Sequence, residues 1–165
     1  MSETFRQYIK HIQESLDSML PFQCIENNSQ NCTFKFTFDG VDFIVKFTFT
    51  PAEDKVIAVV AFFSLDEHGQ ENTDLTFKHK SSLLLFSTVV NIIKQTINKW
   101  DVLCFVNEPD RYGLYSLLVK RFTKEFKVSS TNTQLGTVWF ISKFTLPSEM
   151  KDLIGYAAQQ ILDSK

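Results

Sequence analysis

The sequence has few of the residues that build disulfide-stapled, metal-bound or loop-rich proteins. Its 165 residues include three cysteines, five glycines and four prolines. The cysteines, Cys24, Cys32 and Cys104, form no Cys-x-x-Cys pair and have no histidine at zinc-ligand spacing, so no metal site is predicted. No secretory leader is visible, which favours a reducing compartment and three free thiols.

Several motifs of enzyme chemistry and of membrane insertion are also missing from the sequence. It contains no serine in a nucleophile elbow, no P-loop and no HExxH motif. No apolar run approaches the roughly 20 residues that cross a bilayer. The formal net charge of −2 gives no overall attraction to nucleic acid or to an anionic membrane. We therefore expect a protein that is neither secreted nor membrane-bound, and nucleic-acid binding is not indicated.

What the chain has in abundance is phenylalanine. There are 17 Phe residues against four Tyr and two Trp, and 44% of all residues are hydrophobic. Phenylalanine supplies apolar area without a polar atom that needs a hydrogen bond. The composition predicts a single globular domain, residues 1–165, with a phenylalanine-packed core.

Residues 81–126 read as a helix, a strand and a second helix. Apolar residues cover most of the helical circumference of 81–97, which predicts a buried helix. The unbroken apolar run 102–106 (VLCFV) is typical of a strand covered on both faces. Pro109 and Asp110 then open the second helix. This order predicts a sheet with helices packed on both faces.

The first half of the chain has the period of antiparallel strands. Residues 34–49 alternate Phe and Val with polar residues around Asp39-Gly40, which predicts a hairpin with one aromatic face. Pro51 is expected to end its second strand, and 55–65 to form a central strand that is apolar on both sides. The opposite face of the hairpin carries Lys35, Thr37, Asp42 and Lys46.

Loops and terminal helices complete the prediction. Residues 66–80 are polar and predict a loop before the buried helix, and 127–135 predict a loop before a last strand. Amphipathic helices are expected at 1–20 and at 148–163. The fold class is therefore α+β, with a mixed sheet in which an antiparallel meander precedes a parallel crossover.

This order of elements, together with the segment 110–122 (DRYGLYSLLVKRF), resembles the GNAT acyltransferases. The resemblance implies a GNAT-like fold over about residues 30–145. The family's helix often reads Asn-x-x-Ala-x-x-x-Tyr, with the tyrosine as general acid, which implies that role for Tyr115. Glu108 falls on the asparagine of that pattern and Arg111 on the alanine. Tyr115 also fits a tyrosine with a buried ring and a solvated hydroxyl, and Arg111 a solvated residue in the first turn of a helix.

The family's phosphate-binding loop has no counterpart in this sequence. Its Gln/Arg-x-x-Gly-x-Gly/Ala pattern lets backbone N–H groups approach a pyrophosphate. Residues 77–82 (FKHKSS) contain no glycine, so we expect the coenzyme A site to be absent or rebuilt. A rebuilt site would use Lys78, Lys80 and Ser81 at a helix N-terminus, with Arg111 as an anion contact. The alternative is that Lys78 and Lys80 belong to a solvated turn.

A second resemblance is to small uncharacterised proteins of tailed bacteriophages. It is carried by the segments 86–89 (FSTV), 109–111 (PDR), 114–115 (LY) and 120–122 (KRF). Our first hypothesis from the sequence is a non-catalytic protein-binding module of phage origin. It would need no cofactor, and its partner would be a viral or host protein or a second copy of the chain, in the virion or the host cytoplasm. The alternatives are a GNAT-type acyltransferase that uses acetyl-coenzyme A and a small-anion or nucleotide binder at Arg111.

Overall fold

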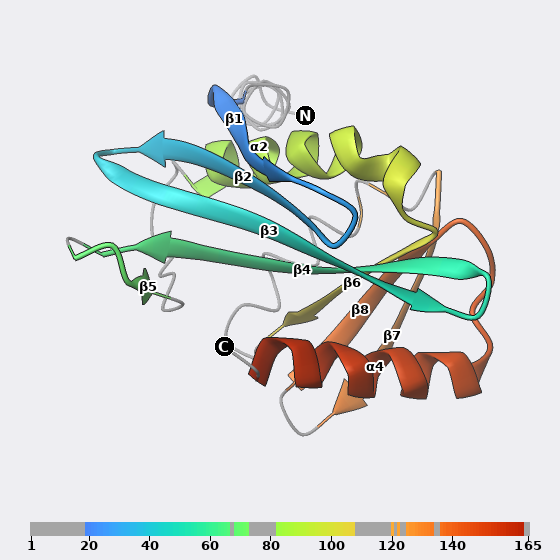
Figure 1. Cartoon of the computed structure of the whole chain (residues 1–165). Helices are drawn as coiled ribbons and strands as arrows, with labels where there is room; N and C mark the ends of the chain where they lie inside the picture. The colour runs from blue at the N-terminus through green and yellow to red at the C-terminus, as the bar shows by residue number, and fades with distance from the viewer. Residues whose placement is uncertain are drawn as a thin grey trace, which may run out of the picture.

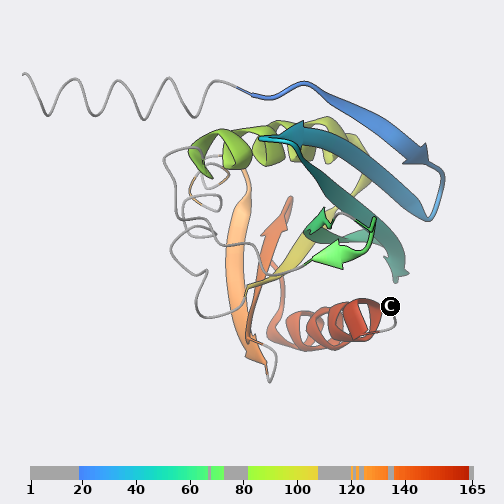
Figure 2. The ribbon, with the colours of Figure 1, turned by 90° about the vertical axis from the view of Figure 1, so that its left-hand side faces the viewer.

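The structure, a computed structural model, describes residues 19–66, 68–72, 82–107, 120, 122, 125–133 and 136–163. Eight strands form one mixed sheet, with α2 on one face and α4 on the other (Figures 1 and 2). This confirms the predicted α+β class with helices on both faces. The strands are β1 (Phe22–Asn27), β2 (Asn31–Phe38), β3 (Val41–Ala52), β4 (Lys55–Leu65), β5 (Glu71–Asn72), β6 (Val102–Asn107), β7 (Lys127–Thr133) and β8 (Gly136–Ser142), and the helices are α2 (Ser82–Thr96), the 3-10 helix η1 (Ile97–Lys99) and α4 (Ser148–Asp163).

The strands follow the order β1-β2-β3-β4-β6-β8-β7 across the sheet, and β5 pairs with β4 outside this path. Among the described strands, β4 and β6 pair in parallel and all other neighbours pair antiparallel. The chain therefore runs as a meander from β1 to β4 and crosses over through α2 to reach β6. This is the predicted meander followed by a parallel crossover.

The β2–β3 hairpin forms where the alternation of residues predicts it. Asp39 (φ 52°) and Gly40 (φ 77°) make its two-residue turn in the left-handed region that this type of turn requires. On the polar face, Thr37 Oγ1 donates a 2.7 Å hydrogen bond to Asp42 Oδ1, and Lys35 Nζ lies 3.5 Å from Asp42 Oδ2. The phenylalanines of the other face point into the core.

Pro51 does not end its strand, contrary to the prediction. It lies inside β3, opposite Val56 of β4. Val56 directs its backbone N–H and C=O away from β3, because both groups bond to Asp101. The β3–β4 ladder therefore needs no N–H donor at Pro51, and proline is tolerated at such a position.

Two segments predicted as loops contain strands. β7 covers most of the polar segment 127–135, and β5 lies within 66–80. β7 pairs with β8 along its length, so pairing with an apolar neighbour overrides its polar composition. β5 turns back onto β4 because Gly69 takes φ +76° and the Asp66 carboxylate accepts backbone bonds from His68 and Gln70.

Two predicted helices fall mostly or entirely on residues that the structure does not describe. The amphipathic helix expected at 1–20 lies outside the described residues except for its last two. Of the helix expected after Pro109, Lys120 and Phe122 are described and are helical, whereas Glu125 and Phe126 are described and are not. The C-terminal helix α4 has the predicted bounds.

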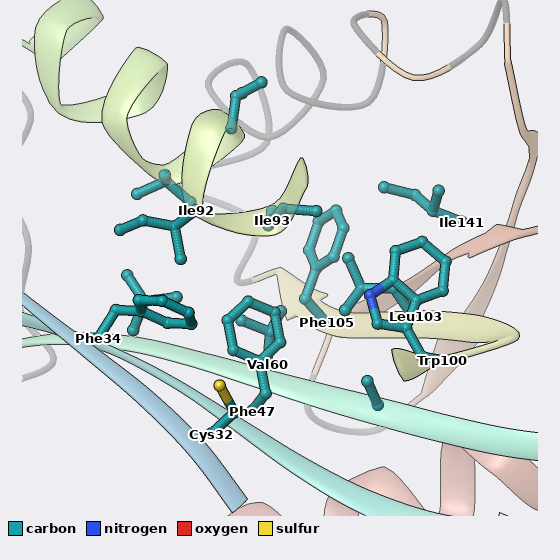
Figure 3. Packing of buried hydrophobic residues seen from close by; sticks show 14 of the residues in the cluster. Cys32, Phe34, Phe47, Val60, Ile92, Ile93, Trp100, Leu103, Phe105 and Ile141 are labelled. Carbon is teal, nitrogen blue, oxygen red and sulfur yellow. The ribbon is translucent and has the colours of Figure 1, made fainter. Parts of the chain in front are cut away.

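The core has one cluster on each face of the sheet. On the α2 face, buried residues of α2 pack on phenylalanines and aliphatic residues of β2, β3, β4 and β6 (Figure 3). The rings of Phe36 and Phe43 are stacked, with centroids 5.3 Å apart, and Phe62 stacks on Phe43 at 5.8 Å. On the α4 face, Ile154 and Ala158 pack on β4, β6 and β8. β4 and β6 are therefore covered on both sides, as their apolar sequences predict.

Candidate functional site

The parallel ladder between β4 and β6 is short. Its register joins Ile57 to Val102, Ala58 to Leu103 and Val59 to Cys104, and it ends there. Beyond this point β4 continues along β3, and β6 continues along β8 as far as Asn107. The two parallel strands therefore diverge toward their carboxyl ends (Figure 1). Open sheets bind ligands at the carboxyl ends of parallel strands, so this divergence is the candidate site.

The amino ends of the same two strands are held together by Asp101. Its carboxylate Oδ2 accepts a 2.8 Å hydrogen bond from Val56 N, and its own N–H donates a 2.9 Å bond to Val56 O. Its carbonyl accepts a 3.1 Å bond from Lys143 N, just beyond the end of β8. The divergence of β4 and β6 thus starts from a fixed end.

Trp100 fixes the connection from the crossover helix to β6. Its side chain is 1% exposed, and its Nε1 donates a 2.9 Å hydrogen bond to Thr96 Oγ1. Lys143 Nζ lies over the ring, 5.4 Å from its centroid, and donates to Ile97 O at 2.6 Å. The position of β6 is therefore coupled to α2 by packing and by hydrogen bonds.

β5 borders the divergence at the carboxyl end of β4. Its two residues pair with Ser64 and Leu65. Ser64 is also paired with Phe43 of β3, so β5 must lie on the opposite edge of β4, the edge that faces β6. The segment Val60–Phe63 therefore lies between the β4–β6 ladder and the β4–β5 ladder.

The described walls of the site are apolar. Val60 and Phe105 are buried on the α2 face, and Val59 and Cys104 on the α4 face. Strand residues 60–65 and 105–107 include no carboxylate, imidazole or amine. A general acid or base for this site would therefore come from residues beyond these strand segments.

Cys104 lies where the parallel ladder ends, but it is not a usable nucleophile. Its side chain is fully buried, and burial raises the pKa of its thiol to about 12. Because only the thiolate attacks carbonyl carbon efficiently, Cys104 stays inert near neutral pH.

All six residues that the sequence predicts for the site lie outside the described residues. Glu108, Arg111 and Tyr115 follow the end of β6, and Lys78, Lys80 and Ser81 precede the start of α2. Their catalytic and binding roles stay predictions. The structure does show that both segments connect to the diverging end of the sheet, because β6 ends at Asn107 and the crossover helix begins at Ser82. The first turn of α2 has no acidic residue that would oppose a bound anion.

Sequence reasoning did not single out Asp101 or β5, which shape the two ends of the site. The signals for both are weak: an aspartate before an apolar run, and a glycine inside a polar segment. Within the described ranges, no group of three or more His, Cys, Asp or Glu side chains is arranged to hold a metal ion. None of the described helices has both the length and the apolar character that crossing a membrane requires.

The chain matches no protein-family model and no curated protein. A search of solved structures finds the crystal structure of an acetyltransferase of the GNAT family from Streptococcus pneumoniae, at 15% identity and a TM-score of 0.41, covering 72% of this chain and 70% of that one. It also finds FeeM, an N-acyl amino acid synthase from uncultured soil microbes, at 14% identity and a TM-score of 0.36, covering 85% of this chain and 90% of that one. The predicted GNAT-like fold is confirmed, with the strand order and the short parallel ladder described above.

The first hypothesis from the sequence, a non-catalytic protein-binding module of phage origin, is contradicted. The two similar structures are named as an acetyltransferase and an N-acyl amino acid synthase, and neither name indicates a phage protein or a non-catalytic one. The hypothesis relied on the missing glycines of residues 77–82, together with the well-packed core and the amphipathic helices expected at the two ends of the chain. The missing glycines rule out one way of binding a pyrophosphate, by the backbone N–H groups of a glycine loop. They do not change the rest of the fold.

Proposed function

We propose that the protein is an acyltransferase whose acyl donor is acetyl-coenzyme A, the enzyme alternative raised by the sequence. The observation that carries this proposal is the β4–β6 ladder, which ends after three pairs and lets two parallel strands diverge at their carboxyl ends. An extended acyl donor such as acetyl-coenzyme A could bind between the diverging carboxyl ends of β4 and β6. Fold alone does not establish an activity, so the proposal depends on this geometry together with the predicted residues around it.

The chemistry of the donor suits the two parts of the site. The apolar walls at Val60 and Phe105 favour the largely aliphatic pantetheine arm. The anionic pyrophosphate would be held by Lys78 and Lys80 and by the N-terminus of α2, where a helix dipole favours negative charge. This arrangement replaces backbone N–H groups of a glycine loop with lysine side chains.

The transfer proposed here is direct. The nitrogen of an amine acceptor attacks the thioester carbonyl carbon, the new C–N bond forms and the C–S bond breaks. Coenzyme A leaves as a thiolate and takes a proton from Tyr115, and the acceptor nitrogen gives up a proton to Glu108. No acyl-cysteine at Cys104 is involved, since its thiol is buried with a pKa of about 12.

The experiment combines binding and turnover. Isothermal titration with acetyl-coenzyme A is followed by an assay of free thiol release with a panel of primary amines. We expect Lys78→Ala/Lys80→Ala to weaken donor binding at least tenfold. Tyr115→Phe is expected to bind the donor normally but to lower kcat by about 10²-fold or more. Lys94→Ala, an exposed lysine in the last turn of α2, is the matched control and should change neither quantity.

Two results would overturn the proposal. One is the absence of any heat at millimolar acetyl-coenzyme A. The other is donor binding that remains unchanged in the double lysine variant while no amine in the panel releases coenzyme A.

A further inference from the structure

A cavity of about 420 Å³ lies under the first turns of α4, away from the diverging end of β4 and β6. It is bounded by the tip of the β3–β4 hairpin (Thr50–Glu53), by Ile57 and Val59 at the amino end of β4, and by one side of α4. The α4 helix packs on β4, β6 and β7, and the cavity lies between this helix and the hairpin tip. The volume is in the range of small-molecule pockets.

The body of the cavity is apolar. Ile57 and Val59 have exposed fractions of 1% and 2%, so both belong to the core cluster of the α4 face as well as to the cavity floor. On the helix side the lining includes Met150, Ile154 and Ala157. An aliphatic or aromatic group placed here would exchange water contact for contact with hydrocarbon.

Two carboxylates line the cavity, Glu53 from the hairpin turn and Glu149 from the first turn of α4. Within the described part of the chain, neither makes an ion pair. The adjacent cation, Lys55, lies over the Phe144 ring, with its Nζ 5.3 Å from the centroid. Part of the charge of Glu149 is balanced by the α4 dipole, so Glu53 is the stronger attraction for a cation.

Glu53 is an unfavourable residue for its place in the backbone. It has φ +59° in a two-residue turn, a conformation that glycine and asparagine adopt more readily. In the β2–β3 hairpin the two-residue turn is Asp39-Gly40, and both of these residues have positive φ. A turn built for stability alone would not place glutamate here, which agrees with a role for its carboxylate at the cavity.

We propose that this cavity binds a small organic ammonium ion, with its hydrocarbon body against Ile57, Ile154 and Ala157 and its charge beside Glu53 and Glu149. The apolar floor and the unpaired carboxylates select together for a hydrophobic amine. An alcohol of the same size lacks the charge, and a carboxylic acid carries the opposite one. The inference does not depend on the proposed acyl transfer, because the cavity is at the other end of β4.

The test compares three ligands of equal length, hexylammonium, hexanol and hexanoate, by calorimetry and by NMR titration of the full chain. We expect hexylammonium to bind at least tenfold more tightly than hexanol, and hexanoate not to bind. The methyl resonances of Ile154 and Ala157 should shift. Ala157→Leu fills part of the cavity and should abolish binding of both hexylammonium and hexanol.

The carboxylate is tested with Glu53→Asn, because asparagine suits a positive φ. We expect hexylammonium binding to weaken at least tenfold while the melting temperature stays the same or rises, so that a loss of binding is not a loss of folding. Asp39→Asn makes the same charge change in the other hairpin turn and should leave binding unchanged.

Equal affinity for hexylammonium and hexanol would overturn the proposal, and so would wild-type binding by Glu53→Asn. The absence of hexylammonium binding in the wild type would do the same. None of these outcomes bears on acetyl-coenzyme A, which is titrated separately, so failure of this inference and failure of the proposed acyltransferase are distinguishable.

Discussion

Asp101 and Val56 exchange two hydrogen bonds, one through the Asp101 carboxylate and one through its backbone N–H. The pair lies immediately before the first rung of the parallel β4–β6 ladder, which joins Ile57 to Val102. A side chain therefore extends the ladder by one step at the end where the strands must stay together. The parallel β4–β6 ladder has only three residue pairs after this point. The two Asp101–Val56 hydrogen bonds are therefore a large fraction of the hydrogen bonds between β4 and β6.

Asp101→Ala is expected to lower the free energy of unfolding by about 0.5–1.5 kcal/mol, the net contribution of one hydrogen bond. Val56 is partly exposed, so water can satisfy part of the lost bond. Urea denaturation measures the effect. Asp54→Ala, in the nearby hairpin turn, is the control. Equal stability of Asp101→Ala and wild type would show that the carboxylate does not hold the two strands.

Thr96→Val is expected to lower the free energy of unfolding by about 1–3 kcal/mol. The buried Trp100 Nε1 loses its acceptor, and a buried donor without a partner carries its full desolvation penalty. A double-mutant cycle with Trp100→Phe isolates the hydrogen bond, because Thr96→Val should be much less harmful once the indole N–H is gone. Additive effects in the cycle would contradict the assignment.

The burial of Cys104 predicts a pH dependence of stability. In the unfolded chain the thiol loses its proton near its ordinary pKa of 9.0, but in the folded chain only near 12. Between these values the folded state holds one more proton, so stability falls as pH rises, by about 1.4 kcal/mol per pH unit from this group. Denaturation at pH 8 to 11 should show that the stability difference between wild type and Cys104→Ala is nearly constant below the unfolded pKa of 9.0 and changes with this slope above it. A difference that is constant with pH would rule the effect out.

Gly40→Ala is expected to lower the free energy of unfolding by about 1 kcal/mol. Gly40 has φ +77°, and an added Cβ would meet no atom within 4 Å, so the whole effect comes from the backbone conformation. Gly40→Asn is the matched variant, since asparagine tolerates this region, and it should recover much of the loss. Thermal unfolding followed by circular dichroism measures both.

The Thr37–Asp42 pair predicts a measurable titration. The hydrogen bond from Thr37 is the largest single cause that lowers the pKa of the Asp42 carboxyl, and the charge and the hydrogen bond of Lys35 lower it further. Thr37→Val should therefore raise the pKa of Asp42 in an NMR titration, and Lys35→Met should raise it as well. An unchanged pKa of Asp42 in Thr37→Val would contradict the assignment.

The features that were predictable from the sequence are those that local pattern decides. The alternation around Asp39-Gly40 located the hairpin, and the unbroken run 102–106 located the strand that is buried on both faces. β7 and the continuation of β3 through Pro51 were not predictable, because each depends on its partner: β7 on the apolar β8, and Pro51 on a Val56 that turns its polar groups to Asp101. For the site, the sequence indicated candidate residues after β6 and before α2 but not the short β4–β6 ladder, since register between distant segments has no local signal.

Among the described strands, β1 and β7 lie at the two edges of the sheet, and both are poor templates for a foreign strand. In β1 the pairing with β2 slips at Ile25, and an extra residue of this kind bends the outer row of amide groups. β7 presents the exposed side chains of Lys127, Ser130 and Asn132. Pairing between the edges of two folded molecules is therefore disfavoured, at β1 by the bent row of amide groups and at β7 by the exposed polar side chains.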